Sequence, residues 1–206
     1  MTQKPKKPRR VAFMLDLEWP YKRHTGIFAG TQRYAQEHGW ESTIDEYVAE
    51  NLPERRTKSI PYDGVIARAT SKLAERAARI GLPVVNVWLA SPAWQELPGV
   101  FTDWAAVGRL RAEHLLARGL RRFAAVGGKD RGSKIDMAAF QAEVRKAGFP
   151  CKTVHMTLDP SRSYAAWQKY RQQIDNLMNK WRLPIGVSGL TEDPGRMIAQ
   201  MCRQRG

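Results

Sequence analysis

The sequence of 206 residues has little cysteine and no long apolar run, and each absence excludes a class of protein. Its two cysteines, Cys151 and Cys202, form no CxxC pair and have no histidine close by, which argues against a disulfide framework and a zinc site. The longest apolar runs, such as Phe123 to Val126, are too short to span a bilayer, and no signal-peptide core follows the basic N-terminus. We therefore expect a cytoplasmic protein with reduced cysteines.

Acidic residues are also scarce. The chain has 20 Asp and Glu and 34 Lys and Arg, which gives a formal net charge of +14 at pH 7. An excess of this size favours polyanionic partners, since clustered Lys and Arg displace counterions from phosphates. Residues 1–10 carry five of the basic side chains and two prolines, so this segment is expected to be a disordered arm. Two interpretations stay open, a solvated tail that aids solubility and an arm that contacts DNA.

Catalytic motifs are missing as well. The chain has no GxSxG elbow and no HExxH, and its four histidines share no spacing that would form a site. The stretch 127–134, G-G-K-D-R-G-S-K, is a candidate phosphate loop, but Ser133 and Lys134 stand in the reverse of the order that such a loop needs. We expect no enzyme, no cofactor and no metal, with a nucleotide-binding enzyme that uses this stretch as the alternative. In the preferred interpretation the loop offers charged side chains to a ligand: Lys129, Asp130 or Arg131.

What the sequence does have is an alternation of short apolar runs with longer stretches of helical apolar spacing, which is typical of βα units around a parallel sheet. Strands are expected near residues 11–15, 42–47, 64–67, 84–88, 100–102, 123–126, 152–156 and 185–188. Helices are expected near residues 26–38, 71–80, 103–118, 134–147, 163–180 and 194–204. Four of them end at a glycine: Gly39, Gly81, Gly119 and Gly148. The fold class is therefore α/β, with a first ligand-binding lobe at residues 11–119 and a second at 120–206.

Polar and aromatic side chains gather where the expected strands end. The segment D-L-E-W-P-Y-K-R-H at 16–24 follows the first strand, Arg68 follows the third and Asp103 follows the fifth. Ligands of open parallel sheets bind outside the carboxyl ends of the strands, so these side chains are expected to meet at one crevice. Aromatic rings can cover the C–H face of a sugar, while Arg and carboxylate groups pair with its hydroxyls. The candidate ligand-binding residues are Trp19, Tyr21, Arg23, Arg68, Asp103 and Glu192.

These candidates also have structural alternatives. The aromatic residues of the first loop could simply pack against the end of the hydrophobic core. Asp103 and Glu192 stand where helices are expected to begin, so each could serve as an N-cap that accepts hydrogen bonds from backbone N–H groups. For Asp103 the capping role and ligand binding are compatible with each other.

Several blocks of the sequence carry a family resemblance: R-R-V-A-F-M-L at 9–15, Y-K-R at 21–23, G-T-Q-R-Y-A-Q-E-H-G-W at 30–40, Y-D-G-V-I-A-R at 62–68, G-L-P-V-V at 81–85, T-D-W-A-A-V-G-R-L-R-A-E-H-L-L-A-R-G at 102–119 and R-F-A-A-V-G-G at 122–128. From residue 10 onward the chain resembles the effector-binding region of the xylose operon regulators, AraC-type proteins with lobes related to the lactose repressor and the ribose-binding proteins. The resemblance implies a periplasmic-binding-protein-like fold of type I, in which two α/β lobes close on a pentose-like sugar. It also implies Tyr21 and Arg23 in the first ligand loop, Arg68 at the third strand end and Asp103 at the fifth.

The second lobe departs from the family pattern. Relatives place an Arg in the helix before the Gly-Phe of this lobe, where the present sequence reads D-M-A-A-F at 136–140, and their late Asn-Asp is Thr191-Glu192 here. The sequence also stops before the family's remaining βα units and its helix-turn-helix module. We therefore expect a fragment, a truncated paralogue or a subunit acting through partners, with an incomplete second lobe. It would contact DNA only through a module absent from this chain, and it would form a homodimer because the unfinished sheet leaves an open edge.

Overall fold

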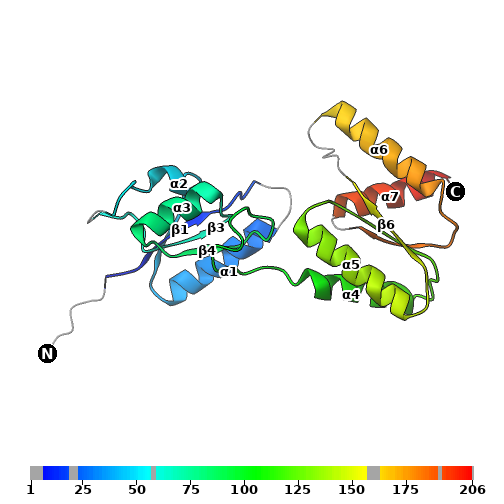
Figure 1. Cartoon of the computed structure of the whole chain (residues 1–206), viewed down its shortest axis with the longest axis horizontal. Coiled ribbons are helices and arrows are strands. Elements are labelled where there is room, and N and C mark those ends of the chain that lie inside the picture. Colours follow the sequence, from blue (N-terminus) through cyan, green and yellow to red (C-terminus); the bar gives the residue numbers. More distant parts are fainter. Residues whose placement is uncertain (1–6, 19–22, 57–58, 157–162, 190–191, 206) are drawn as a thin grey trace. The chain divides into compact units, whose positions relative to one another are not determined.

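The computed structural model describes residues 7–18, 23–56, 59–156, 163–189 and 192–205. It confirms the predicted fold class, because every strand pair in the described residues is parallel and the strands are joined through helices. The chain divides into two units, Met1–Phe101 and Thr102–Gly206, and each contains one sheet (Figure 1).

The first unit contains β1 (Arg10–Met14), α1 (Arg23–Glu37), β2 (Glu41–Ile44), α2 (Val48–Asn51), β3 (Gly64–Ala67), α3 (Ser71–Ile80) and β4 (Val84–Asn86). Its strands lie in the order β2-β1-β3-β4. Successive side chains of β1 point to opposite faces of the sheet. Phe13 meets Phe28 of α1 edge to face, with ring centroids 5.6 Å apart, whereas Ala12 joins the core under α2 and α3. Figure 1 accordingly shows α1 on one side of this sheet and α2 and α3 on the other.

The second unit contains α4 (Trp104–Ala117), β5 (Phe123–Gly127), α5 (Arg131–Lys146), β6 (Cys151–His155), α6 (Tyr164–Met178), β7 (Gly186–Gly189) and α7 (Glu192–Arg205). Its strands lie in the order β6-β5-β7. All five residues of β5 are buried, as expected for a central parallel strand covered on both faces. Phe123 and Ala125 pack in the core beneath α4 and α5, whereas Val126 packs in the core beneath α6 and α7.

Helix α4 approaches α5 so closely that the contact requires a glycine. A Cβ atom built on buried Gly108 would lie 2.3 Å from the backbone oxygen of Asp136 and 3.0 Å from the Cβ of Ala139. Arg111 also joins the two helices, because its Nη1 lies 2.9 Å from Oδ2 of the buried Asp136. These contacts hold α4 in the second unit. The structure therefore divides at Phe101–Thr102, whereas the sequence predicts a division between residues 119 and 120.

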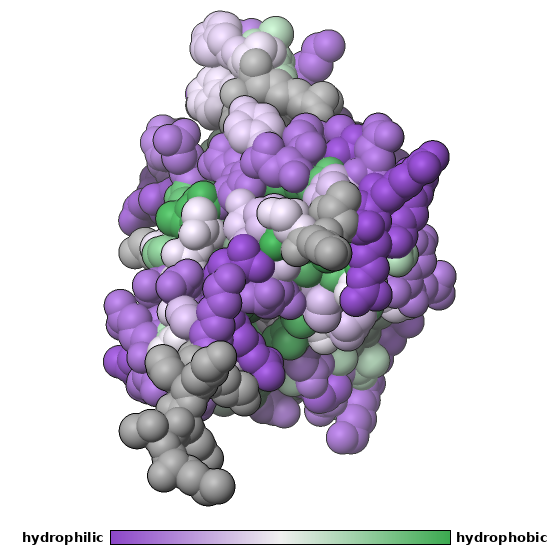
Figure 2. Space-filling model, turned by 90° about the vertical axis from the view of Figure 1, so that its left-hand side faces the viewer, coloured by the Kyte–Doolittle hydropathy of each residue, from purple (hydrophilic) through white to green (hydrophobic). Residues whose placement is uncertain are grey.

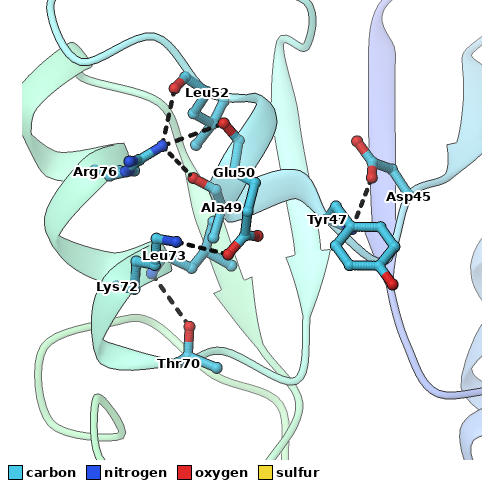
Figure 3. Close-up of polar contacts among 9 residues, drawn as sticks. All are labelled: Asp45, Tyr47, Ala49, Glu50, Leu52, Thr70, Lys72, Leu73 and Arg76. Carbon is cyan, nitrogen blue, oxygen red and sulfur yellow. Dashed lines mark hydrogen bonds and ion pairs between the residues drawn. The ribbon is translucent and has the colours of Figure 1, made fainter.

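Helix α2 is an element that the sequence pattern does not predict, because its four residues are too few to show helical spacing. Contacts from α3 hold it (Figure 3). Nη1 of Arg76 donates to the carbonyl oxygens of Ala49, Glu50 and Leu52 at 2.8, 3.2 and 3.4 Å. Nζ of Lys72 lies 2.7 Å from Oε1 of Glu50. The guanidinium thus satisfies carbonyls at the end of α2 that have no partner within the helix.

The predicted strand at 100–102 is wrong. The chain makes only an isolated parallel bridge there, between Asn86 and Gly99, and Val100 N donates to the carbonyl of Asn86 at 2.9 Å. The chain then leaves the first sheet, since Phe101 is the last residue of the first unit. By contrast, the glycines predicted to end helices all have the expected left-handed backbone: Gly39, Gly81, Gly119 and Gly148.

Polar side chains dominate the face of the molecule that Figure 2 shows. Figure 2 looks onto the left-hand end of Figure 1, where β1 begins, and shows hydrophilic residues over most of this face with small hydrophobic areas between them. In the described part of the chain, no helix combines the length and apolar character that a membrane crossing needs.

Candidate functional site

The strand order of the first unit determines where a ligand can bind. Strands β1 and β3 are neighbours, yet the chain leaves β1 toward α1 on one face and leaves β3 toward α3 on the other face. A crevice forms outside the carboxyl ends of strands where successive connections diverge in this way. The loops after β1, β3 and β4 therefore supply the candidate site.

Arg68 and Trp88 form the centre of this site. Arg68 comes directly after β3, and its backbone N–H donates to the carbonyl of Met14 at the end of β1 at 2.9 Å. Its guanidinium lies 4.2 Å from the centroid of the Trp88 ring, which is a close cation–π distance. Burial lowers the pKa of Arg68, and the nearby Asp16 carboxylate opposes this shift while Arg23 adds to it. The side chain remains cationic at neutral pH, as arginine does in proteins.

His24 lies beside this pair at the start of α1. It is 4% exposed, and its Nδ1 lies 2.7 Å from the carbonyl oxygen of Asp16. Because a carbonyl can only accept, Nδ1 carries the proton of this hydrogen bond. Burial lowers the pKa of His24, the bond to Asp16 opposes the shift, and the cationic Arg68 and Arg23 reinforce it. The ring is therefore neutral and ties the β1 loop to α1.

A buried amide fixes the loops that carry Arg68 and Trp88. Asn86 is fully buried, and its Oδ1 accepts from the backbone N–H groups of Ala69 at 3.3 Å and Trp88 at 2.9 Å. Its Nδ2 donates to the carbonyl of Trp88 at 3.0 Å. Buried Ser91 adds a bond from its Oγ to the carbonyl of Ala69 at 2.6 Å. The buried side chains of Asn86 and Ser91 thus join the loops after β3 and β4.

The second unit places its candidate residues at helix starts. Oδ1 of Asp103 accepts from the N–H of Ala106 at 2.9 Å, so the predicted N-cap of α4 is present. Asp130 caps α5 in the same way, since its Oδ1 accepts from Ser133 N at 3.0 Å and its Oδ2 accepts a short hydrogen bond from Ser133 Oγ. The carboxylate of Asp130 therefore occupies the helix N-terminus that a phosphate group would use.

The structure brings part of the predicted site together. Arg23 is the first residue of α1 and is close enough to Arg68 and His24 to affect their pKa values. Asp103 belongs to the second unit, and it is described here within that unit alone. Trp19 and Tyr21 lie outside the described residues, and so does the side chain of Glu192, whose backbone begins α7.

Sequence reasoning missed Trp88 and Asn86. The expected strand at 84–88 placed Trp88 inside the sheet, whereas β4 ends at Asn86 and Trp88 lies in the loop beyond it. A signal was available, since an Asn directly before a short apolar run at a strand end commonly bonds to the backbone two residues on.

The groups that border the site are aromatic, cationic and neutral hydrogen-bonding side chains: an aromatic ring, a guanidinium and a neutral imidazole. Among the described residues, no group of His, Cys, Asp or Glu is arranged to hold a metal ion. Such a set can cover an apolar face of a small ligand and make directed hydrogen bonds to its polar groups.

Residues 12–167 match the family described as periplasmic binding proteins and sugar binding domain of the LacI family. No curated protein matches the sequence. Among solved structures, the xylose-binding transcription activator XylR has a TM-score of 0.72 at 20% identity, and the match covers 96% of this chain and 50% of that chain. A LacI family transcriptional regulator from Enterococcus faecium with bound ribose has a TM-score of 0.67 at 16% identity, covering 96% and 72% of the two chains. The transcriptional regulator CelR in its cellobiose complex has a TM-score of 0.66 at 17% identity, covering 97% and 64%.

The present chain thus spans half the length of XylR. Identities this low show a shared fold, the periplasmic-binding-protein-like α/β fold of type I. The family match covers most of the sequence, and it includes β1, β3 and β4, whose ends carry the candidate site. The chain therefore belongs to the family of periplasmic binding proteins and LacI-type sugar-binding domains.

Proposed function

We propose that this chain is the sugar-sensing effector domain of a transcription regulator and that its ligand is a pentose-like sugar. The observation that carries the proposal is the Arg68 guanidinium stacked on Trp88 at the point where the β1 and β3 connections diverge. An indole face suits the C–H surface of a sugar ring, and a guanidinium edge suits its hydroxyls.

The other candidate contacts of this proposal are Arg23 in the first unit and Asp103 and Glu192 in the second, with Trp19 and Tyr21 from the β1 loop. A sugar favours one conformation of the protein only through contacts that it makes better in that conformation. Binding would regulate transcription in the cytoplasm. This role involves no chemical conversion of the sugar and hence no enzyme.

Titration calorimetry with a panel of pentoses and hexoses tests the ligand class. We expect measurable heat with at least one pentose and weaker heat with hexoses. If no sugar gives heat while circular dichroism shows a folded protein, the proposal is wrong.

The site itself is tested by Arg68→Gln, which keeps a polar side chain but removes the charge. Losing a charged hydrogen-bond donor is expected to weaken sugar binding about tenfold or more. The matched control is Arg79→Gln, because Arg79 is exposed on α3 and forms a solvent-exposed ion pair with Glu75 at 3.8 Å. Equal weakening by both variants would contradict the assigned site.

A nucleotide-binding enzyme that uses residues 127–134 is the second candidate. The Asp130 carboxylate at the start of α5 disfavours it, since a phosphate there would meet a negative charge. If ATP raises the unfolding temperature and Lys134→Ala abolishes the effect, the nucleotide function replaces the sugar function.

We also propose that the protein forms a homodimer. Strands β2, β6 and β7 are open sheet edges in the described structure, and Ile44 at the end of β2 is 48% exposed. Sedimentation velocity is expected to show a concentration-dependent dimer, and a monomer across micromolar concentrations would contradict this assembly.

A further inference from the structure

Basic charge is distributed unevenly between the two units. Residues 11–101 contain 10 Lys and Arg and 11 Asp and Glu, so their formal charges nearly cancel. Residues 102–206 contain 19 Lys and Arg and only 9 Asp and Glu. Apart from the first ten residues, the excess positive charge of the chain therefore lies in the second unit.

The fold gathers much of this excess at one edge of the second sheet. Phe123 pairs with both Cys151 and Gly186, so β5, β6 and β7 begin side by side. The chain reaches these strand starts from the ends of α4, α5 and α6, and Figure 1 shows α5, α6 and α7 ending at the same end of this unit, at the right. At all three places, exposed basic residues lie in the last turn of the helix or in the connection after it, and we call six of them the basic edge: Arg118, Arg121, Arg122, Arg145, Lys180 and Arg182.

Few carboxylates neutralise the basic edge. Lys146 nearby is paired with Glu143 at 3.7 Å, and Arg205 at the end of α7 is paired with Asp175. Within the part of the chain that the structure describes, no carboxylate forms a salt bridge with any residue of the basic edge.

Two members of the basic edge are held in place by uncharged groups. The guanidinium of Arg121 lies 5.6 Å from the ring centroid of Phe149, and Nη1 of Arg122 donates to the carbonyl of Leu183 at 3.4 Å. Both contacts leave the positive charge uncompensated.

The first unit provides an internal comparison, because it has the same architecture. Cations near helix C-termini complement the helix dipole, and this preference applies equally to both units. At the corresponding edge of the first unit, Arg10 pairs with Asp63 at 3.3 Å and Arg79 with Glu75 at 3.8 Å, whereas Arg9 lies 5.8 Å from the ring centroid of Trp40. Two basic side chains at that edge are thus offset by carboxylates, while in the described residues none of the basic edge is.

We propose that the basic edge binds the phosphate backbone of double-stranded DNA. Five of its six residues are arginines, whose planar forks match phosphate oxygens better than a lysine ammonium does. Neighbouring strands lie about 4.8 Å apart, so the three connections present a row of cations to a polymer that carries one charge per about 1.7 Å of helix axis.

The scarcity of exposed apolar side chains at this edge favours nucleic acid over a membrane or a protein partner. Leu183, 72% exposed, is its one exposed large apolar side chain among the described residues. Membrane insertion requires an apolar face, and protein interfaces have aromatic and apolar cores. DNA binding here needs no sugar and no base-reading helix.

The test uses the full chain and a fluorescent random-sequence duplex of about 25 base pairs, with binding followed by anisotropy at several salt concentrations. The variant Arg118→Gln/Arg145→Gln/Arg182→Gln removes one charge from each of these three places, and none of the three side chains makes a hydrogen bond or ion pair in the described structure. The control Arg33→Gln/Arg109→Gln/Lys169→Gln removes the same charge from exposed positions elsewhere.

We expect the basic-edge variant to bind DNA about tenfold or more weakly at low salt and to lower the slope of log K against log salt by about two to three. The control is expected to change affinity by less than about threefold. Equal weakening by the control, or no weakening by the basic-edge variant, overturns the proposal.

Vesicles of phosphatidylcholine and phosphatidylserine separate lipid from nucleic acid. If the basic-edge variant loses vesicle binding but keeps DNA binding, the edge is a membrane surface and the proposal is overturned. Sugar calorimetry on the same variant is expected to match the unaltered chain. A failure of the sugar function is thus distinguishable from a failure of the basic edge.

Discussion

His24 is an ionisable side chain whose burial has a consequence for stability. Its pKa in the folded protein lies below the ordinary value of 6.5. Between these two values the unfolded chain binds more protons than the folded chain, so stability decreases as the pH falls through about 6.5 and stops changing below the folded pKa.

We expect the free energy of unfolding, measured with urea at about pH 7.5 and pH 5.5, to fall less in His24→Gln than in the unaltered chain. Glutamine retains a hydrogen-bond donor but has no proton to gain. The control is His114→Gln, which makes the same substitution at an exposed position on α4. If the unaltered chain and both variants lose the same free energy of unfolding between these pH values, groups other than His24 cause the acid sensitivity.

The two cysteines are expected to differ in reactivity. Cys151 is buried in β6, and this burial raises the pKa of its thiol to about 11, whereas Cys202 is exposed on α7. The thiolate is the reactive species. With a thiol-specific disulfide reagent at about pH 8, one thiol should react quickly in the native protein and two in denaturant, and Cys202→Ser should remove the fast phase. Fast reaction of both native thiols would contradict the buried position of Cys151.

Among individual residues, the sequence predicts the candidate site only in part. The rule that ligands bind at strand ends selects Arg68, and Arg23 lies close enough to it to affect its pKa. The position of Trp88 depends on the hydrogen bonds of Asn86, and hydrophobic periodicity carries no information about such bonds. The ligand-binding roles of all six candidates remain predictions: Trp19, Tyr21, Arg23, Arg68, Asp103 and Glu192.

Among the helices, the contact of α4 with α5 is the most sensitive to a small change. Gly108→Ala would place a methyl group against backbone atoms of α5 that cannot move aside independently. We expect a loss of about 1–3 kcal/mol in the free energy of unfolding. Gly30→Ala in α1 is the control, since a Cβ there meets nothing within 4 Å. The helix propensity of alanine should stabilise that variant by about 0.5–1 kcal/mol, and destabilisation by both changes would contradict the stated cause.

Helix α2 depends on the guanidinium of Arg76. Removing it in Arg76→Ala leaves the carbonyls at the end of α2 without their donor, at a cost of about 1–2 kcal/mol by chemical denaturation. The control is Arg79→Ala, whose ion pair with Glu75 is 62% exposed on both sides and should contribute less than about 0.5 kcal/mol. Similar costs for the two variants would mean that Arg76 does not hold α2.

The sequence predicts the helices and strands whose apolar residues recur at a regular spacing. Seven of the eight expected strands and all six expected helices are present, because each has its own apolar spacing and several have a terminal glycine. Helix α2 and the division at Phe101–Thr102 instead follow from contacts between distant residues, those of Arg76 with α2 and those of Gly108 with α5.

Across the whole molecule, each unit has cores of its own. The two cores of the first unit contain only residues from Val11 to Leu97, and the two cores of the second only residues from Ala112 to Met201. A local defect should therefore increase amide hydrogen exchange within its own unit. We expect Arg76→Ala to raise exchange in residues 11–101 and Gly108→Ala to raise it in residues 102–206, as measured by mass spectrometry. Spread of either effect over both units would show a single cooperative structure.

Each unit is also one continuous piece of chain, since in the described structure no strand of either sheet comes from the other half of the sequence. During synthesis, every partner needed for the order β2-β1-β3-β4 has left the ribosome once Phe101 emerges from it. The first sheet can therefore close its hydrogen bonds while the second is still being translated, and the nascent chain need not wait for its C-terminal half before burying its apolar residues.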